Sequence, residues 1–415
     1  MIELEETLCR LEDRTAPVIP FGTSGRSQIV RAGDNLFATA IQPGGDSPWV
    51  LWCRAENGWS PVQQLDSSET QSPPGLAALP GARIIVSLSG QADCGTRLLE
   101  FSADDPEGVP RRILPAPPAA PDDDLERSSG TCLAADGRTG QALLLLHSPG
   151  ESDDRCQPLY WGCLDPDRTW RRSGHLSFPI NVMRTSAALR DGAAHMVAAG
   201  VTTPVNNAGH LWGTAPQTTP PVSRRLFYGR CADTRKGNFD PPVEIDSVEA
   251  TCGRIGNLDL WLSPDGSTHL LYLRENICDP ALRDRKWPSA PLVTSLEHAV
   301  LKEGILIHRR TLMTAVEPHR HYVPEQACFH EDAAGNARVI CSVRRELSGE
   351  GRCCLVRKIG SGLSGNGEWK ELNVRTPPVR FSCSTGRVGA RRSDVVEMLG
   401  MDSNEQSVRY LRIAA

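Results

Sequence analysis

The chain has 415 residues, of which 37 are glycine and 32 proline, and a formal net charge of −5. This charge argues against a generic nucleic-acid-binding protein, which needs a basic excess or a basic face. The sequence contains no run of about 18 apolar residues, and its N-terminus lacks the basic and then apolar layout of a signal peptide. We therefore expect a cytoplasmic protein with neither nucleic acid nor membrane as partner.

Turn-forming residues are frequent, and no stretch keeps apolar residues at helical spacing over three turns, so we expect an all-β chain. Within it, a degenerate unit recurs seven times: a small-residue strand, a strongly apolar strand, a third strand and a short polar strand. Such units predict a single seven-bladed β-propeller of four-stranded antiparallel blades. Two stacked β-sandwiches are the alternative, but they do not explain the repetition.

The blades are expected, within one domain spanning residues 1–415, at 28–65, 75–114, 131–176, 185–245, 257–312, 326–374 and 386–413. In the fifth blade we expect Gly304–Leu312 as third strand, after a long insertion at Glu275–Glu303, and a short or missing outer strand. The seventh blade offers only three strands, beginning with Gly386–Ala390. The N-terminal segment Ile2–Leu11 alternates enough to supply its fourth strand, which would close the ring and remove an exposed sheet edge.

One turn carries a family resemblance. The run Cys163-Leu-Asp165-Pro-Asp167-Arg-Thr169-Trp170 matches the pattern S-x-D-x-G-x-T-W at Asp165, Thr169 and Trp170, whereas its serine and glycine are replaced. The chain thereby resembles the sialidase-like propellers with Asp-box (BNR) repeats, and by its blade count the seven-bladed propeller polysaccharide lyases and related glycosidases. The box is structural in that family, so the resemblance supports the fold and says little about chemistry. The complete catalytic set of true sialidases does not map onto this chain.

Arginines recur where the chain approaches successive inner strands: Arg184, Arg254, Arg320 and either Arg380 or Arg387. Loops at this position of a propeller open on one face, so we expect these cations to point at one axial funnel. A guanidinium suits a carboxylate or sulfate because its donors form a planar fork. The implied ligand is anionic, and the alternative is that each arginine pairs with a carboxylate of a neighbouring blade.

Other candidates for substrate binding lie near these arginines and in the expected insertions. They are Asn181 before blade four, Asn207 and His210 within it, and Arg274 and Glu275 in blade five. Amides, an imidazole and an aromatic side chain are usual in sugar recognition, and long ordered loops tend to be functional lids. Tolerated surface insertions are the alternative.

The densest cluster of chemical groups lies in the loop 317–326, where we expect His319, His321 and Tyr322 to be catalytic. A neutral histidine or ionised tyrosine can remove the proton next to the carboxylate of a uronic acid, with Tyr322 or the second histidine as acid. That reaction is a β-elimination. A His-x-His pair can chelate a metal, but no third ligand is evident, so we expect no metal and no cofactor. A purely structural loop is the alternative.

The sequence therefore predicts a carbohydrate-active enzyme acting on an acidic oligosaccharide or polysaccharide, containing uronic or sialic acid, at the propeller axis. One alternative is a sialidase-like glycoside hydrolase, which needs two carboxyl groups at a defined separation. The carboxyl groups available for this are Glu275, Asp284, Glu297, Glu317 and Glu325. The other alternative is a non-catalytic glycan-binding or protein-interaction propeller.

Overall fold

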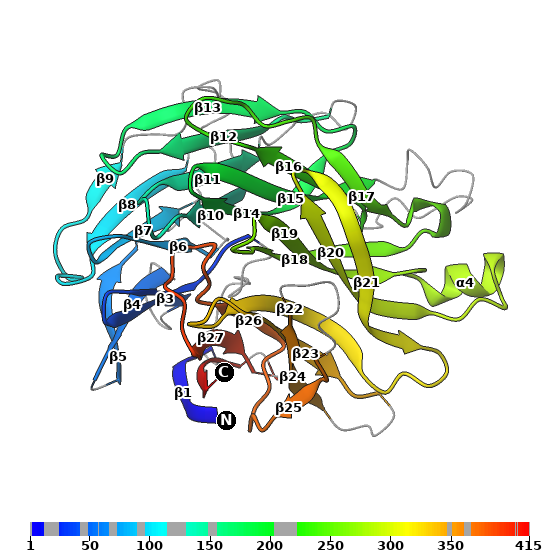
Figure 1. The fold of residues 1–415 in the computed structure, drawn as a ribbon. Coiled ribbons are helices and arrows are strands. Elements are labelled where there is room, and N and C mark those ends of the chain that lie inside the picture. The colour runs from blue at the N-terminus through cyan, green and yellow to red at the C-terminus, as the bar shows by residue number, and fades with distance from the viewer. Residues whose placement is uncertain are drawn as a thin grey trace.

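The computed structural model describes residues 2–11, 25–41, 49–56, 58–65, 73–88, 96–113, 130–147, 156–202, 222–346, 351–360, 367–402, 404 and 406–414. Within these ranges, seven four-stranded antiparallel sheets surround a central axis as the blades of a β-propeller (Figure 1). This arrangement confirms the predicted fold class. The described helical segments are a 3-10 turn at Glu249–Thr251 and helix α4 at Pro280–Lys286, and neither has the length and apolarity needed to cross a membrane.

Each blade runs from an inner strand near the axis to an outer strand at the periphery, as β10 to β13 show in Figure 1. The strands, blade by blade, are β2 (Ile29–Ala32), β3 (Asn35–Ile41), β4 (Trp49–Ala55) and β5 (Gly58–Gln64); β6 (Gly75–Leu79), β7 (Arg83–Leu88), β8 (Arg97–Ser102) and β9 (Arg111–Ile113); β10 (Gly130–Ala135), β11 (Ala142–His147), β12 (Leu159–Leu164) and β13 (Trp170–Leu176); β14 (Val182–Arg190), β15 (Ala193–Thr202), β16 (Val222–Cys231) and β17 (Val243–Ser247); β18 (Arg254–Leu262), β19 (Ser267–Glu275), β20 (Val293–Lys302) and β21 (Ile305–Val316); β22 (Val323–Glu331), β23 (Ala337–Arg344), β24 (Arg352–Ile359) and β25 (Lys370–Leu372); and β26 (Arg380–Cys383), β27 (Val395–Met401), β28 (Ser407–Ala414) and β1 (Ile2–Arg10).

The second strand of each blade explains why the repeat is readable in the sequence. In β11, the residues Ala142 to Leu146 are all buried, because the neighbouring blades cover both faces of the sheet. Such a strand reads as a continuous apolar run. Outer strands such as β5 are covered on fewer sides and read as polar.

Successive strands run antiparallel, so the inner strands all begin at the same end of the axis. We call this end the front face. The loops between second and third strands lie there too, because a second strand ends where an inner strand begins. The fold therefore brings loops from different blades, far apart in the sequence, to one surface.

The N-terminal strand closes the ring, as predicted. β1 pairs antiparallel with β28, from Ile2 opposite Ile413 to Arg10 opposite Ser407, and becomes the outer strand of the seventh blade. In Figure 1 the two chain ends accordingly lie close together. Leu8 and Leu11 are buried in the core.

The fifth blade has a complete outer strand, so the strand assignment predicted there was wrong. Its third strand is β20, inside the expected insertion, and the segment predicted as third strand belongs to the outer strand β21. The insertion shrinks to residues 276–292. β20 was missed because Glu297 and His298 make it look polar, yet both are buried, and Thr311 Oγ1 of β21 donates to both Glu297 oxygens at 3.0 and 3.1 Å.

The inner strand of the seventh blade is β26, not the predicted Gly386–Ala390. That segment instead crosses the axis and bonds to two other blades: Ala78 N donates to Val388 O at 2.8 Å, and Ala135 N donates to Arg387 O at 3.0 Å. Small residues are needed there because the backbones approach closely. A Cβ on Gly389, which has φ +80°, would lie 2.0 Å from Ala78 O.

Deleting residues 1–11 should destabilise the whole propeller, because the seventh blade loses its outer strand. Removing the buried Leu8 and Leu11 side chains alone should lower the free energy of unfolding by at least about 4 kcal/mol. Urea denaturation of the deletion variant and of Glu3→Gln, which loses only an exposed ion pair with Arg412, provides the measurement and its control. Equal stability of the deletion variant and the wild type would contradict closure by this strand.

Candidate functional site

Three arginines from three blades come together at the front face. Arg184 lies near the start of β14, Arg254 begins β18 and Arg380 begins β26, and all three side chains are accessible to solvent. Desolvation by the surrounding protein lowers the pKa of the Arg184 guanidinium, and the positive charges of Arg254 and Arg380 lower it further. We call these three residues the axial arginine cluster. The charge of Arg184 is therefore repelled by one cation on the adjacent blade and by another across the axis.

One carboxylate partly balances the cluster. Glu275, at the end of β19, accepts from Arg254 Nη2 at 2.5 Å and from Arg254 Nε at 3.1 Å. Desolvation acts to lower the pKa of Arg254, but the hydrogen bonds and the charge of Glu275 leave it raised. The side chain of Arg380 has no hydrogen-bond or ion-pair partner in the described ranges. Glu275 thus balances one of the three cations, that of Arg254.

A buried ion pair lies on the axis. Arg387 Nε donates to Asp259 Oδ1 at 2.8 Å, and the two side chains are only 10% and 3% exposed. The other carboxylate oxygen accepts from Phe329 N at 2.8 Å, so blades five, six and seven meet at Asp259. Of the two arginines predicted for the seventh blade, Arg380 therefore joins the front-face cluster and Arg387 is internal.

His147 is a candidate functional residue that the sequence analysis missed. It ends β11, and its Nε2 lies 3.2 Å from Oγ1 of Thr185, the neighbour of Arg184 in β14. Burial and the positive charge of Arg26 lower the pKa of the imidazole to about 4, so it is neutral at neutral pH. Alternate side chains of a strand point to opposite faces, so Thr185 and His147 lie on the blade-three face of β14, turned away from the Arg184 side chain. The position of His147 at a strand end was the only signal in the sequence.

The loop predicted to be catalytic lies on the front face between β21 and β22. His319 and His321 are exposed, and neither side chain makes a hydrogen bond or ion pair with the part of the chain that the structure describes. Tyr322 is 39% exposed, and the Arg345 guanidinium lies over its ring, 5.9 Å from the centroid. Arg345 in turn bonds to Glu371 of β25, so Tyr322 faces blade six. The catalytic role of the three residues stays a prediction.

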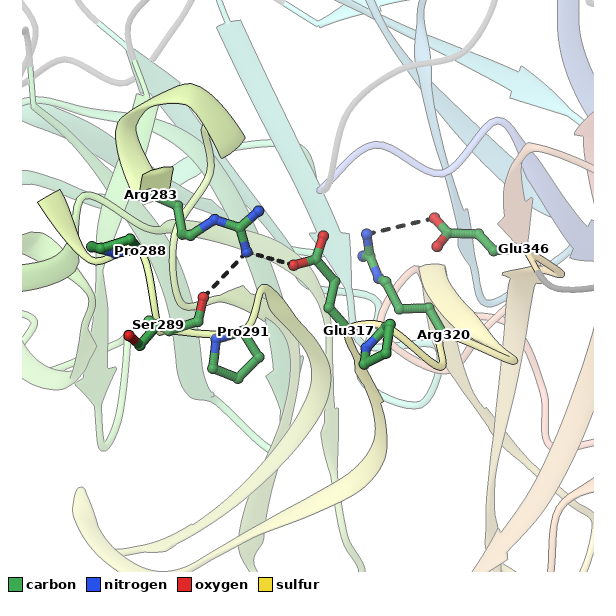
Figure 2. A pocket seen from close by; sticks show the side chains of 9 residues that line it. Arg283, Pro288, Ser289, Pro291, Glu317, Arg320 and Glu346 are labelled. Atoms are coloured by element: carbon green, nitrogen blue, oxygen red, sulfur yellow. Dashed lines mark hydrogen bonds and ion pairs between the residues drawn. The ribbon is translucent and has the colours of Figure 1, made fainter. Parts of the chain in front are cut away.

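Arg320 belongs to a pocket between blades five and six, shown in Figure 2. The pocket has a volume of about 480 Å³. Its lining comes from Arg283, residues 288–291, residues 317–318, Arg320 and Glu346. Arg283 Nη1 donates to Glu317 Oε2 at 2.7 Å, and Arg320 lies 3.5 Å from Glu346. Arg320 also donates to Thr294 Oγ1 at 2.8 Å. We call this site the rim pocket.

The remaining predicted binding residues are placed differently. Asn181 Oδ1 accepts from Gln157 N at 2.8 Å, which ties two front-face loops together. Arg274 forms an ion pair with Asp246 at 3.3 Å, across the seam between blades four and five. Asn207 and His210 lie outside the described residues.

The five carboxylates considered for hydrolysis are all held by neighbouring side chains. Glu275 pairs with Arg254, Asp284 and Glu317 pair with Arg283, Glu297 pairs with Arg309, and Glu325 pairs with Arg344 and Arg352. Each of the five therefore has a cationic partner. In the described ranges, no group of three or more His, Cys, Asp or Glu side chains is arranged to hold a metal ion.

No protein-family profile and no curated protein matches the chain. The chain is similar in structure to the polysaccharide lyase Uly1, at 12% identity and a TM-score of 0.57, over 100% of this chain and 99% of that one. It is also similar to an α-L-arabinanase of Penicillium chrysogenum complexed with arabinobiose, at 13% identity and a TM-score of 0.47, over 82% and 92% of the two chains. A prolyl endopeptidase matches at 11% identity and a TM-score of 0.51, over 94% of this chain and 46% of that one.

The likenesses to Uly1 and to the prolyl endopeptidase show the propeller fold, and a polysaccharide lyase is among the proteins that share it. The predicted membership of the Asp-box family stays a prediction. The box-like run does form a tight turn between β12 and β13, in which Asp165 N donates to Thr169 O at 3.0 Å and Arg168 has φ 72°.

Replacing Arg387 by Met should lower the free energy of unfolding by about 3–5 kcal/mol, because it leaves a buried carboxylate without its cation. Burial raises the pKa of Asp259 above its ordinary value, so the charged form is the unfavourable one in the folded state. The loss should therefore be larger at about pH 8 than at about pH 5, because the unpaired carboxyl group takes up a proton at a higher pH than the paired one does. Urea denaturation at both pH values measures this.

The double variant Asp259→Leu/Arg387→Met is the matched control. It removes both charges and should recover most of the lost stability. A single variant whose loss is the same at both pH values would contradict this account of the axial pair.

Proposed function

We propose that the protein binds an acidic glycan through the axial arginine cluster and cleaves it by β-elimination. The observation that carries the proposal is the electrostatic contact of Arg184 with Arg254 and Arg380. Holding three cations together is unfavourable, and a carboxylate or sulfate among them removes the repulsion. Guanidinium forks match such groups geometrically.

The cluster supports this chemistry because elimination needs a neutralised carboxylate. A base removes the proton next to the carboxylate, its electron pair forms the new carbon–carbon double bond, and the bond to the glycosidic oxygen breaks. That oxygen then takes up a proton. Negative charge develops on the carboxylate during the first step, and preorganised arginines stabilise it.

Two sets of histidines compete for the role of base. His147 is neutral, and its hydrogen-bond partner Thr185 is the residue that follows Arg184 in β14. His319 and His321, with Tyr322 as acid, are the set that the sequence favours. We propose His147, because Thr185 ties it to the strand that carries Arg184, whereas Tyr322 faces blade six. An anion bound at the cluster would raise the basicity of the imidazole.

Two further considerations favour a lyase over a hydrolase. The carboxylates considered for hydrolysis are engaged in ion pairs with arginines. A glycosidase instead needs two carboxyl groups that act together on the glycosidic bond. The polysaccharide lyase Uly1 shares the fold over the full length of both chains, so the scaffold is compatible with lyase chemistry.

The double variant Arg184→Ala/Arg254→Ala should bind acidic oligosaccharides at least about a hundredfold more weakly, because each charged hydrogen bond contributes about 1.5–3 kcal/mol. Binding by the wild type should also weaken as salt is added. Calorimetric titration with a panel of uronate oligosaccharides measures both effects. Arg112→Ala, which removes an exposed arginine from the outer strand β9, is the control. Unchanged affinity in the double variant would rule out the anionic site.

His147→Gln should lower kcat by about two to four powers of ten, with the fold intact, if the imidazole is the base. The reaction can be followed by the absorbance of the new double bond. The acid limb of kcat/KM should lie near pH 4, because His147 is neutral above its pKa of about 4. A fully active His147→Gln beside an inactive His321→Ala or Tyr322→Phe would instead assign catalysis to the 319–322 loop.

A further inference from the structure

At the front edge of blade five, residues in register lead outward from the axis, and those on the first three strands are polar. Arg254 pairs in register with Glu275, Glu275 with Thr294, and Thr294 with Ala315. These four residues lie on β18, β19, β20 and β21, so the row crosses the whole blade. The distance from β18 to β20 is two strand spacings, about 10 Å.

The rim pocket begins where this row ends. Arg320 Nη2 donates to Thr294 Oγ1 at 2.8 Å, so one wall of the pocket rests on the third strand of the row. The pocket and the axial arginine cluster therefore lie at the same edge of blade five, with Glu275 and the buried Thr294 between them. A ligand that extends beyond the cluster along blade five reaches the pocket next.

The charge of the rim pocket differs from that of the cluster. Its two arginines are matched by two carboxylates, with Arg283 and Glu317 pointing toward each other and Arg320 pointing toward Glu346 in Figure 2. The charge of Arg283 and its hydrogen bond hold the pKa of Glu317 below its ordinary value, although burial opposes this. The carboxylate is thus ionised and accepts hydrogen bonds. With no excess of either charge, the pocket gives no preference to an anion.

These groups fit the surface of an uncharged sugar. Guanidinium groups donate and carboxylates accept, and a sugar hydroxyl does both. Pro288, Pro291 and Pro318 add apolar surface for the carbon–hydrogen faces of a ring.

We propose that the rim pocket binds an uncharged sugar of the same oligosaccharide whose acidic sugar is held by the axial arginine cluster. The inference rests on the proposed function. It narrows the substrate class to glycans in which an acidic residue is followed by a neutral one, in place of a polymer of acidic sugars only.

The test compares glucuronate, two disaccharides that carry neutral xylose on either side of glucuronate, and digalacturonate. Affinities come from calorimetry, or from KM where a sugar is cleaved. At least one xylose-containing disaccharide should bind about tenfold more tightly than glucuronate, an increment expected for one or two net hydrogen bonds. Digalacturonate should gain less.

Ser289→Trp tests the pocket by filling it from an exposed position while all four charged residues remain. It should abolish the tenfold gain and change the affinity for glucuronate by less than about twofold, whereas Arg184→Ala should weaken the binding of every sugar. Arg283→Ala, checked for folding by its Tm, should reduce the gain as well.

The outcomes separate this inference from the proposed function. If glucuronate binds and the gain from xylose survives both Ser289→Trp and Arg283→Ala, or if no gain exists, the rim pocket is not a subsite. An equal gain for digalacturonate overturns its preference for an uncharged sugar. If none of the sugars binds to the wild type, the proposed function fails and the subsite fails with it.

Discussion

The pairing of β1 with β28 is the constraint on which the rest of the structure depends. The inner strand of each blade packs against the inner strands of the two neighbouring blades or against strands next to them, so a ring of seven is complete only when its first and last parts are joined. Here the join lies within a blade, where backbone hydrogen bonds connect Ile2–Arg10 to Ser407–Ala414. Side chains reinforce it, since Glu6 of β1 accepts two hydrogen bonds from Arg54 of the first blade. Opening the join would expose two sheet edges and loosen every front-face loop.

The closure was predictable because it depends on counting. The last four-strand unit ends one strand short, and the alternating segment Ile2–Leu11 belongs to no other unit. The simplest arrangement is therefore that this segment supplies the missing strand. The strands of blades five and seven were less predictable, because long-range contacts decide them. β20 contains the buried Glu297, which Thr311 satisfies from the next strand. The segment Gly386–Ala390 has the composition of an inner strand, but it forms hydrogen bonds with blades two and three. The local sequence does not show that the segment lies near those blades.

The candidate site, too, was predictable from the sequence only in part. The sequence placed arginines at the starts of inner strands, and in a propeller that position alone directs Arg184, Arg254 and Arg380 to one surface. Side-chain direction was beyond such reasoning: Arg320 turns to Thr294 and Tyr322 faces Arg345, although they are two residues apart. His147 was missed because its significance comes from Thr185 and Arg26, which belong to other blades. Residue type and strand position are thus readable, whereas partners across a seam are not.

The arginine cluster also links folding to binding. Folding brings Arg184 to within electrostatic reach of Arg254 and Arg380. Desolvation first, and then the charges of these two arginines, lower the pKa of Arg184 and so oppose its charged form. Glu275, which lies on the same blade as Arg254, relieves part of the repulsion for that arginine and holds its guanidinium in place. An anion that binds at the front face, as we propose, would bind the folded state and not the unfolded chain, because only folding brings the three arginines together. Part of the free energy of holding the cations together would then be recovered on binding, and the ligand would stabilise the ring.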